Sequence, residues 1–162
     1  MASLSQAGGK TGQVVAIDDW PSILGDAAKE VFSMMVGAEL TVANGHLPGF
    51  ANVTGVIGIG GALTGVLTFR CSTDCAVKIA SQMLGVPAAE AASQYADAVG
   101  EICNMVAGHF KAKIGHEATC LLSIPSVIMG KDYRVHSDRC SKIEAAMLFG
   151  GEPISISLDV RR

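Results

Sequence analysis

Three segments of the chain carry apolar residues at the three-to-four spacing of an amphipathic helix. The first runs from about Trp20 to Leu40, with its apolar residues on one face. A shorter helix is expected to open at Ser72 or Thr73, which suit an N-cap, and to close at Gly85. The longest runs from about Ala92 to Ile114. These three segments carry the predicted helical content.

Two other regions alternate apolar and polar residues on either side of a Gly-Gly pair, which is typical of a β-hairpin. The first hairpin is expected over Val53 to Ile59 and Leu63 to Phe69, and the second over Ile143 to Phe149 and Ile154 to Val160. Further strand is expected over two stretches that precede the second hairpin, Thr119 to Met129 and Tyr133 to Val135.

The two long helices repeat a polar pattern. Four positions of the first helix align at a constant offset of 71 with four positions of the longest helix: Asp26, Glu30, Ser33 and Gly37 align with Asp97, Glu101, Asn104 and Gly108. Each helix is followed by strands. The simplest fold is therefore α+β, with duplicated helix-plus-strands units that form an antiparallel sheet on which the long helices pack.

The length of the chain suits one domain of this kind. At 162 residues it can bury a sizeable core, whereas two full domains would be cramped. We expect a single domain over 15–162. The small and polar stretch 1–14 has no apolar h-region, so it is interpreted as a flexible N-terminal leader and not as a signal peptide.

Composition adds an expectation about assembly. Apolar residues make up 49% of the chain and charged residues only 17%, and the mean hydropathy is +0.40. Much of this apolar surface must be hidden, which favours a homodimer. The continuous apolar stretches have about ten residues or fewer, against the ~20 that cross a bilayer, so membrane insertion is not expected.

Charge and cysteine content bear on partners and compartment. The net charge is -3 and the pI is near 5.7, so nucleic acid is not an expected partner. The five cysteines include no CxxC pair, and an odd number without an export signal favours free, mostly buried thiols. We therefore expect a cytoplasmic protein without a disulfide framework.

One stripe of the longest predicted helix is the candidate functional site. At about 100° per residue, five side-chain positions fall within about 40° of one line, with the apolar residues on the opposite side: Asp97, Glu101, Asn104, Gly108 and Lys111. An ordinary solvated face is the alternative. Against it stand the weak helix propensity of Asn, the cost of a mid-helix Gly and the recurrence of the pattern in the first helix.

This stripe, together with a downstream strand, resembles a known family. The segment Asp97-xxx-Glu101-Ile-Cys-Asn104-Met-Val-Ala-Gly108 and the Leu122-Ser-Ile-Pro125 strand resemble the CheC/CheX/FliY chemotaxis phosphatases, and CheX members most closely. The resemblance extends from about Trp20 to Val160. It implies a phosphatase that hydrolyses the aspartyl phosphate of a response-regulator receiver domain of the CheY type.

The family resemblance also implies a division of labour between the two polar residues. Asn104 would orient the attacking water, and Glu101 would form a salt bridge with the lysine of the receiver. Ser33 stands where an Asn would complete a second site, so Glu30 and Ser33 are not expected to form an equivalent centre.

The chemistry of the reaction agrees with these roles. Hydrolysis needs a water in line with the breaking P–O bond, and a carboxamide can both donate to and accept from that water without adding charge beside a dianion. Glu101 is a poor base against an anionic phosphate but a good docking partner for a lysine. Asp97, Gly108 and Lys111 are expected to contact the partner. The chain is expected to need no cofactor of its own, and Mg²⁺ is expected in the receiver.

Other chemistries fit the sequence less well. The glycines around Gly58 and Gly60 lack the third glycine of a dinucleotide fingerprint, and Gly60-xxxx-Gly65 is not followed by Lys and Ser/Thr. Four possible metal ligands match no familiar zinc spacing: Cys103, His109, His116 and Glu117. We expect His109 to pack in the apolar side of its helix, and Cys103 to lack the His base that a nucleophile needs.

Two non-enzymatic hypotheses also remain open. The same stripe could dock a receiver without hydrolysing its phosphate. The chain could also be a structural subunit of a larger assembly such as a motor switch. A rate measurement separates these from the enzyme, because only the enzyme shortens the lifetime of the phosphorylated receiver.

Overall fold

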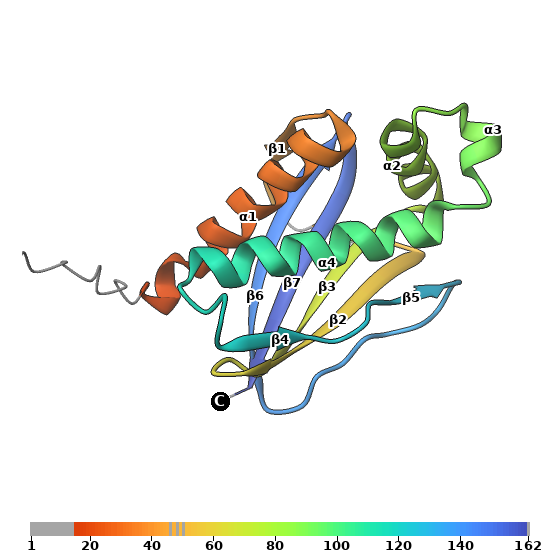
Figure 1. Ribbon diagram of the computed structural model, residues 1–162. Helices are drawn as coiled ribbons and strands as arrows, with labels where there is room; N and C mark the ends of the chain where they lie inside the picture. The colour runs from red at the N-terminus through yellow and green to blue at the C-terminus, as the bar shows by residue number, and fades with distance from the viewer. Residues whose placement is uncertain (1–14, 46, 48, 50, 162) are drawn as a thin grey trace, which may run out of the picture.

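Helices pack on one face of a seven-stranded antiparallel sheet (Figure 1). The structure, a computed structural model, describes residues 15–45, 47, 49 and 51–161. The leader expected over 1–14 lies outside these residues. The strand order is β1-β6-β7-β3-β2-β4, and β5 also pairs with β2. The predicted α+β class is confirmed.

The helical and strand elements follow the sequence pattern closely. The helices are η1 (Ile17–Asp19), α1 (Trp20–Val31), η2 (Phe32–Val36), α2 (Thr73–Leu84), α3 (Ala88–Ala91) and α4 (Tyr95–Lys113). The strands are β1 (Leu40–Val42), β2 (Val53–Gly61), β3 (Gly65–Cys71), β4 (Cys120–Leu122), β5 (Ser126–Met129), β6 (Cys140–Phe149) and β7 (Glu152–Arg161). Both predicted hairpins form, as β2–β3 and β6–β7.

The strand order of the sheet is symmetric about its centre, as the predicted duplication requires. The two hairpins meet at the centre, where β3 pairs with β7. On one side β1, which follows α1 and η2, pairs with β6. On the other side β4, which follows α4, pairs with β2. Each half therefore consists of a long helix, an edge strand and a hairpin, and each edge strand joins the hairpin of the other half.

The first long helix departs from the prediction at its C-terminal end. Its α-helical part stops at Val31, and the chain continues as a π-helical turn to Val36. Gly37 then adopts a left-handed conformation with φ of 69°, which a glycine accepts without steric cost. Leu40, predicted as helix, begins β1 instead. The helix predicted to Leu40 is therefore too long.

Two further predictions are corrected. The strand expected over Thr119 to Met129 is split into β4 and β5 by three irregular residues. The strand expected over Tyr133 to Val135 does not form. Instead, the Tyr133 hydroxyl lies 2.7 Å from Thr54 Oγ1 on β2, so a tertiary hydrogen bond fixes this loop in place of strand pairing.

Close approach of α4 to the sheet depends on a glycine in β2. A Cβ atom at Gly55 would lie 3.2 Å from Cys103 Cβ and 3.2 Å from Val99 Cγ1, both on α4. Such contacts are tighter than normal packing, so a larger residue would push the helix outward. The helix that carries the candidate site is thus seated directly on β2.

Across the described residues, no helix has the length and apolar character that a membrane span requires.

Candidate functional site

The predicted stripe lies on the outer side of α4. Asp97 and Glu101 are exposed, and Asn104, Gly108 and Lys111 are partly exposed. The opposite side of the helix is fully buried, with eight residues against the sheet and the other helices: Ala98, Val99, Gly100, Ile102, Cys103, Val106, Ala107 and Phe110. The amphipathic pattern therefore predicted the orientation of the helix correctly.

Glu101 and Asn104 are available to a partner. They lie three residues apart on one face of a continuous helix, a spacing at which side chains are neighbours. Within the described part of the chain, neither side chain forms a hydrogen bond or an ion pair. The carboxylate and the amide thus keep their hydrogen-bonding capacity for an external group, while the buried side of α4 holds their backbone in place.

Gly108 and Lys111 differ in what surrounds them. A Cβ atom at Gly108 would have nothing within 4 Å, so this glycine leaves open space on the surface. The Lys111 ammonium donates to the carbonyl of Glu117 at 2.9 Å and to that of Cys120 at 2.7 Å. Lys111 thereby ties the end of α4 to the loop that leads into β4. Its expected contact with a partner stays a prediction.

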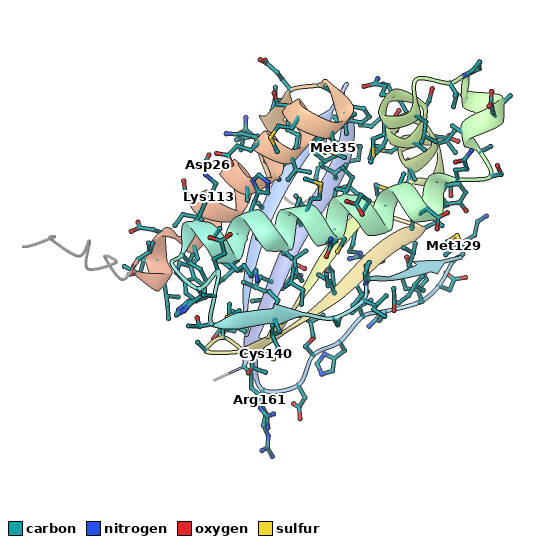
Figure 2. The ribbon with its side chains drawn as sticks, in the orientation of Figure 1. Asp26, Met35, Lys113, Met129, Cys140 and Arg161 are labelled. Carbon is teal, nitrogen blue, oxygen red and sulfur yellow. The ribbon has the colours of Figure 1, made fainter. Side chains whose placement is uncertain are left out.

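The first repeat uses its glutamate in a different way. Lys113 Nζ donates to Glu30 Oε1 at 2.6 Å, and His109 Nδ1 lies 3.3 Å from Glu30 Oε2. These bonds from Lys113 and His109 hold the pKa of the Glu30 carboxyl below its ordinary value. We call this three-residue group the Glu30 clasp. Figure 2 labels Lys113 on α4 near Asp26 on α1, where the two helices lie side by side.

Sequence reasoning missed the Glu30 clasp. The helical position of His109 predicts packing on the apolar side of its helix, but its side chain is 30% exposed and faces Glu30. Glu30 lies 79 residues from His109 and 83 residues from Lys113. No local spacing rule connects residues at such separations. The only signal was the recurrence of Glu30 at the position of Glu101.

The competing cysteine chemistry finds no support in the structure. Cys103 is fully buried, and burial raises the pKa of its thiol to about 12. A thiolate nucleophile needs the opposite shift. His109, its nearest candidate base along the helix, faces Glu30. Among the described residues no three side chains of His, Cys, Asp or Glu gather as a metal site would require.

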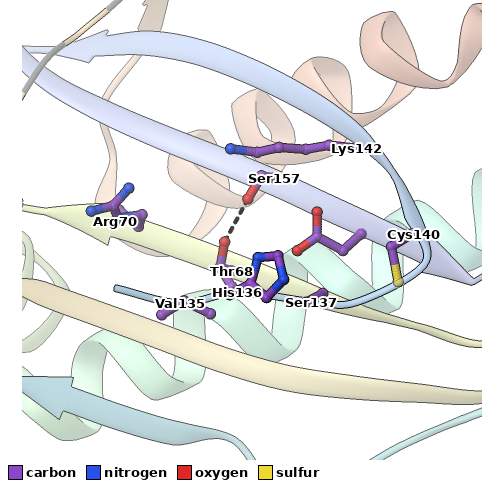
Figure 3. A pocket seen from close by; sticks show the side chains of 9 residues that line it. Thr68, Arg70, Val135, His136, Ser137, Cys140, Lys142 and Ser157 are labelled. Carbon is purple, nitrogen blue, oxygen red and sulfur yellow. Dashed lines mark hydrogen bonds between the residues drawn. The ribbon is translucent and has the colours of Figure 1, made fainter. Parts of the chain in front are cut away.

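A separate hollow lies on the other side of the sheet from α4, beneath the loop that precedes β6 (Figure 3). Its lining is polar and of mixed charge, with Arg70, His136 and Lys142 opposite Asp159. The hydroxyls of Thr68 and Ser157 lie 2.6 Å apart in its floor. None of the five predicted stripe residues lines this hollow.

Comparison with known proteins gives consistent matches. The family model described as Chemotaxis phosphatase CheX matches residues 53–147, a range that contains the whole stripe. The CheY-P phosphatase CheX of Thermotoga maritima is 28% identical over 127 residues, which are 77% of this chain and 81% of that protein.

Solved structures share the fold. The chemotaxis protein CheX from Desulfovibrio desulfuricans has a TM-score of 0.73 at 22% identity, covering 88% of this chain and 99% of its own. The CheX-CheY-BeF3-Mg complex from Borrelia burgdorferi also gives 0.73, at 18% identity, covering 89% of this chain and 99% of its own.

Proposed function

This chain belongs to the CheX family of chemotaxis phosphatases, and we propose that it hydrolyses the aspartyl phosphate of a CheY-like receiver domain. The observation that carries the proposal is the exposure of Glu101 and Asn104, both without a partner in the described chain, on one face of a firmly seated helix. A polar pair presented in this way suits insertion into a pocket of another protein. The named activity of the Thermotoga maritima relative points in the same direction.

Asn104 is proposed to position the attacking water. Its amide oxygen accepts a hydrogen bond from the water and its NH₂ group donates one, so the water is held in line with phosphorus. The amide is uncharged, and it adds no repulsion to the phosphoryl dianion. Orientation of this kind contributes on the order of 10- to 1000-fold to the rate.

Glu101 is proposed to dock the receiver. As an exposed carboxylate one turn before Asn104, it is placed to pair with the active-site lysine of the receiver. Proton abstraction from water is a less suitable role, because little base catalysis is needed when the transition state is dissociative. Asp97 and Gly108 are proposed to line the contact on either side of the pair.

Mg²⁺ is proposed to arrive with the receiver. A carboxylate cluster that would hold the ion is not found among the described residues. In the Borrelia burgdorferi complex the metal accompanies CheX, CheY and BeF₃. The part of this chain would then be confined to placing water and docking, while the metal and the lysine of the receiver neutralise the developing charge.

The test is the lifetime of a phosphorylated receiver. Receivers from the source genome are phosphorylated with acetyl phosphate, the donor is removed, and decay is followed with and without an excess of this protein. The proposal predicts that at least one receiver decays faster. Binding without acceleration would favour the non-catalytic docking module instead.

The expected homodimer is also a proposal. Light scattering of the purified chain tests it directly, with a mass of twice 16.7 kDa as the predicted result and a mass of one chain as the contrary result.

A further inference from the structure

Four methionines lie on α4, η2 and α2, the helical elements around the proposed catalytic pair. Met105 follows Asn104 on α4, and Met34 and Met35 lie on η2. Met83 lies on α2, which packs against both α4 and η2. Figure 2 labels Met35 in the space between α1 and α2, on the side of α4 that faces them. We call these four residues the methionine patch.

The methionine patch is accessible and anchored. Met34 is 60% exposed, and the other three are partly exposed. Met35, Met83 and Met105 also pack against the main core, so their positions are fixed at one end. An apolar side chain as open as Met34 gains free energy when a partner covers it.

The direction of Met105 connects the patch with the stripe. Met105 is four residues from both Glu101 and His109, so the three share the side of α4 that turns toward the first repeat. The contact between His109 and Glu30 shows that this side faces α1. α1 continues directly into η2, which carries Met34 and Met35. Met105, one helical turn after Glu101, therefore connects the methionine patch with the polar pair.

We propose that the receiver domain docks on the methionine patch while Glu101 and Asn104 enter its phosphorylation pocket. This inference rests on the proposed function. A specific protein interface buries roughly 800 Å² on each partner, which two polar side chains cannot supply. Apolar contacts beside the polar pair supply the rest, and the patch is continuous with that pair. Thioether side chains adapt to differently shaped surfaces, which suits them to such a contact.

Methionine methyl NMR tests the placement directly. The chain has seven methionines, so methyl-¹³C labelling gives a small set of signals. On addition of a receiver held in its phosphorylated form by beryllofluoride and Mg²⁺, the signals of Met34, Met35, Met83 and Met105 are expected to shift. Met129, which is 53% exposed on β5 and lies outside the space between α1 and α2 in Figure 2, and the buried Met147 are expected to stay unchanged.

A matched pair of variants tests the energetic role. Met34→Ser is expected to raise the KM for the phosphorylated receiver about 10-fold and to leave kcat within about twofold, because one exposed apolar contact is lost. Met129→Ser removes a side chain of similar exposure, 53% against 60%, and is expected to leave KM unchanged. Thermal unfolding of both variants verifies that they fold.

Each contrary result has a distinct meaning. If wild-type protein hydrolyses the phosphate but Met34→Ser keeps the wild-type KM and the four signals do not move, the docking patch is wrong and the proposed function stands. If the four signals shift with protein concentration alone, a second copy covers the patch and the proposal is overturned. If no receiver is bound or hydrolysed by the wild-type chain, the proposed function fails and the docking patch fails with it.

Discussion

The two repeats use the same polar positions in opposite ways. In the second repeat, Glu101 and Asn104 stand on an unbroken α-helix with no partner among the described residues. In the first repeat, Glu30 is bound by His109 and Lys113, and Ser33 lies in a π-helical turn. Glu101 is proposed to pair with an external partner, whereas Glu30 links α1 to α4.

This difference suggests how a duplicated fold can support a single site. Ser33 lies in a π-helical turn, whereas Asn104 lies in an unbroken α-helix, so the two repeats differ in the winding of the backbone that carries the aligned residues. The Glu30 clasp meanwhile links α1 to the C-terminal half of α4. We propose that the first repeat supports the helix that carries the candidate site.

The largest effect is expected at Asn104. Asn104→Ala should lower kcat roughly 100-fold, because the water loses the group that orients it. Binding should be largely preserved, since Glu101 and the methionine patch remain. Stopped-flow decay of the phosphorylated receiver gives kcat, and calorimetry with the beryllofluoride form gives Kd. A variant that loses both in proportion would make Asn104 a docking residue.

A smaller effect is expected at Glu101. Glu101→Ala should lower kcat/KM at least 10-fold and weaken binding, because a charged pair at the interface loses one member. The matched control is Glu30→Ala, which removes the equivalent glutamate of the first repeat. Steady-state kinetics of the two variants distinguishes a docking role of Glu101 from a structural role of Glu30. Equal losses of kcat/KM in both variants would contradict the proposal that only the second repeat binds the receiver.

The control variant has an expected effect of its own, on stability. Glu30→Ala removes both contacts of the Glu30 clasp and should lower Tm slightly, since the groups are largely solvated and such ion pairs contribute little. Circular dichroism melting measures the change. An unchanged Tm would mean that the clasp is incidental to the packing of α1 on α4.

The clasp also makes a pH prediction with a definite sign. The folded pKa of Glu30 is lowered, so its contribution to stability is present above its ordinary pKa and is lost as the pH falls through the lowered value. The Tm difference between wild type and Glu30→Gln should therefore be largest near neutral pH and disappear in acid. A difference that grows toward acid would reverse the sign and contradict the clasp.

The smallest effect is expected from restoring the missing amide. Ser33→Asn gives the first repeat the residue of the second, yet it should add no measurable activity. Position 33 lies in a π-helical turn, and Glu30 remains paired. The test is Ser33→Asn in an Asn104→Ala background, with receiver dephosphorylation as the readout. Recovered turnover would show that only the identity of residue 33 separates the repeats.

Local patterns predicted most of the fold. Both hairpins and the outward stripe of α4 follow from periods of 2 and 3.6 residues, which can be read from neighbouring residues alone. The π-turn and β1 did not follow, because the apolar spacing of 20–40 continues through Gly37 without a local break. Here, pairing of Leu40 with Phe149 decides the structure, a contact between distant segments.

The common exposed face of the candidate residues was predictable for a similar reason and to a similar limit. Glu101 and Asn104 share one helix, so their common face could be calculated from their spacing. The hydrogen bonds from Lys111 to the carbonyls of Glu117 and Cys120 could not be predicted, because they depend on the path of the loop after α4. Family resemblance supplied the reaction, and the stripe supplied only its geometry.

The division between the two repeats is tested most directly by one measurement, the decay rate of a phosphorylated receiver under a saturating concentration of Asn104→Ser. This substitution gives the second repeat the residue that the first one has. The account predicts that the bound receiver decays at its spontaneous rate, while Ser33→Ala accelerates decay as wild type does. Wild-type acceleration by Asn104→Ser would contradict it, because the amide would then not be the group that positions the water.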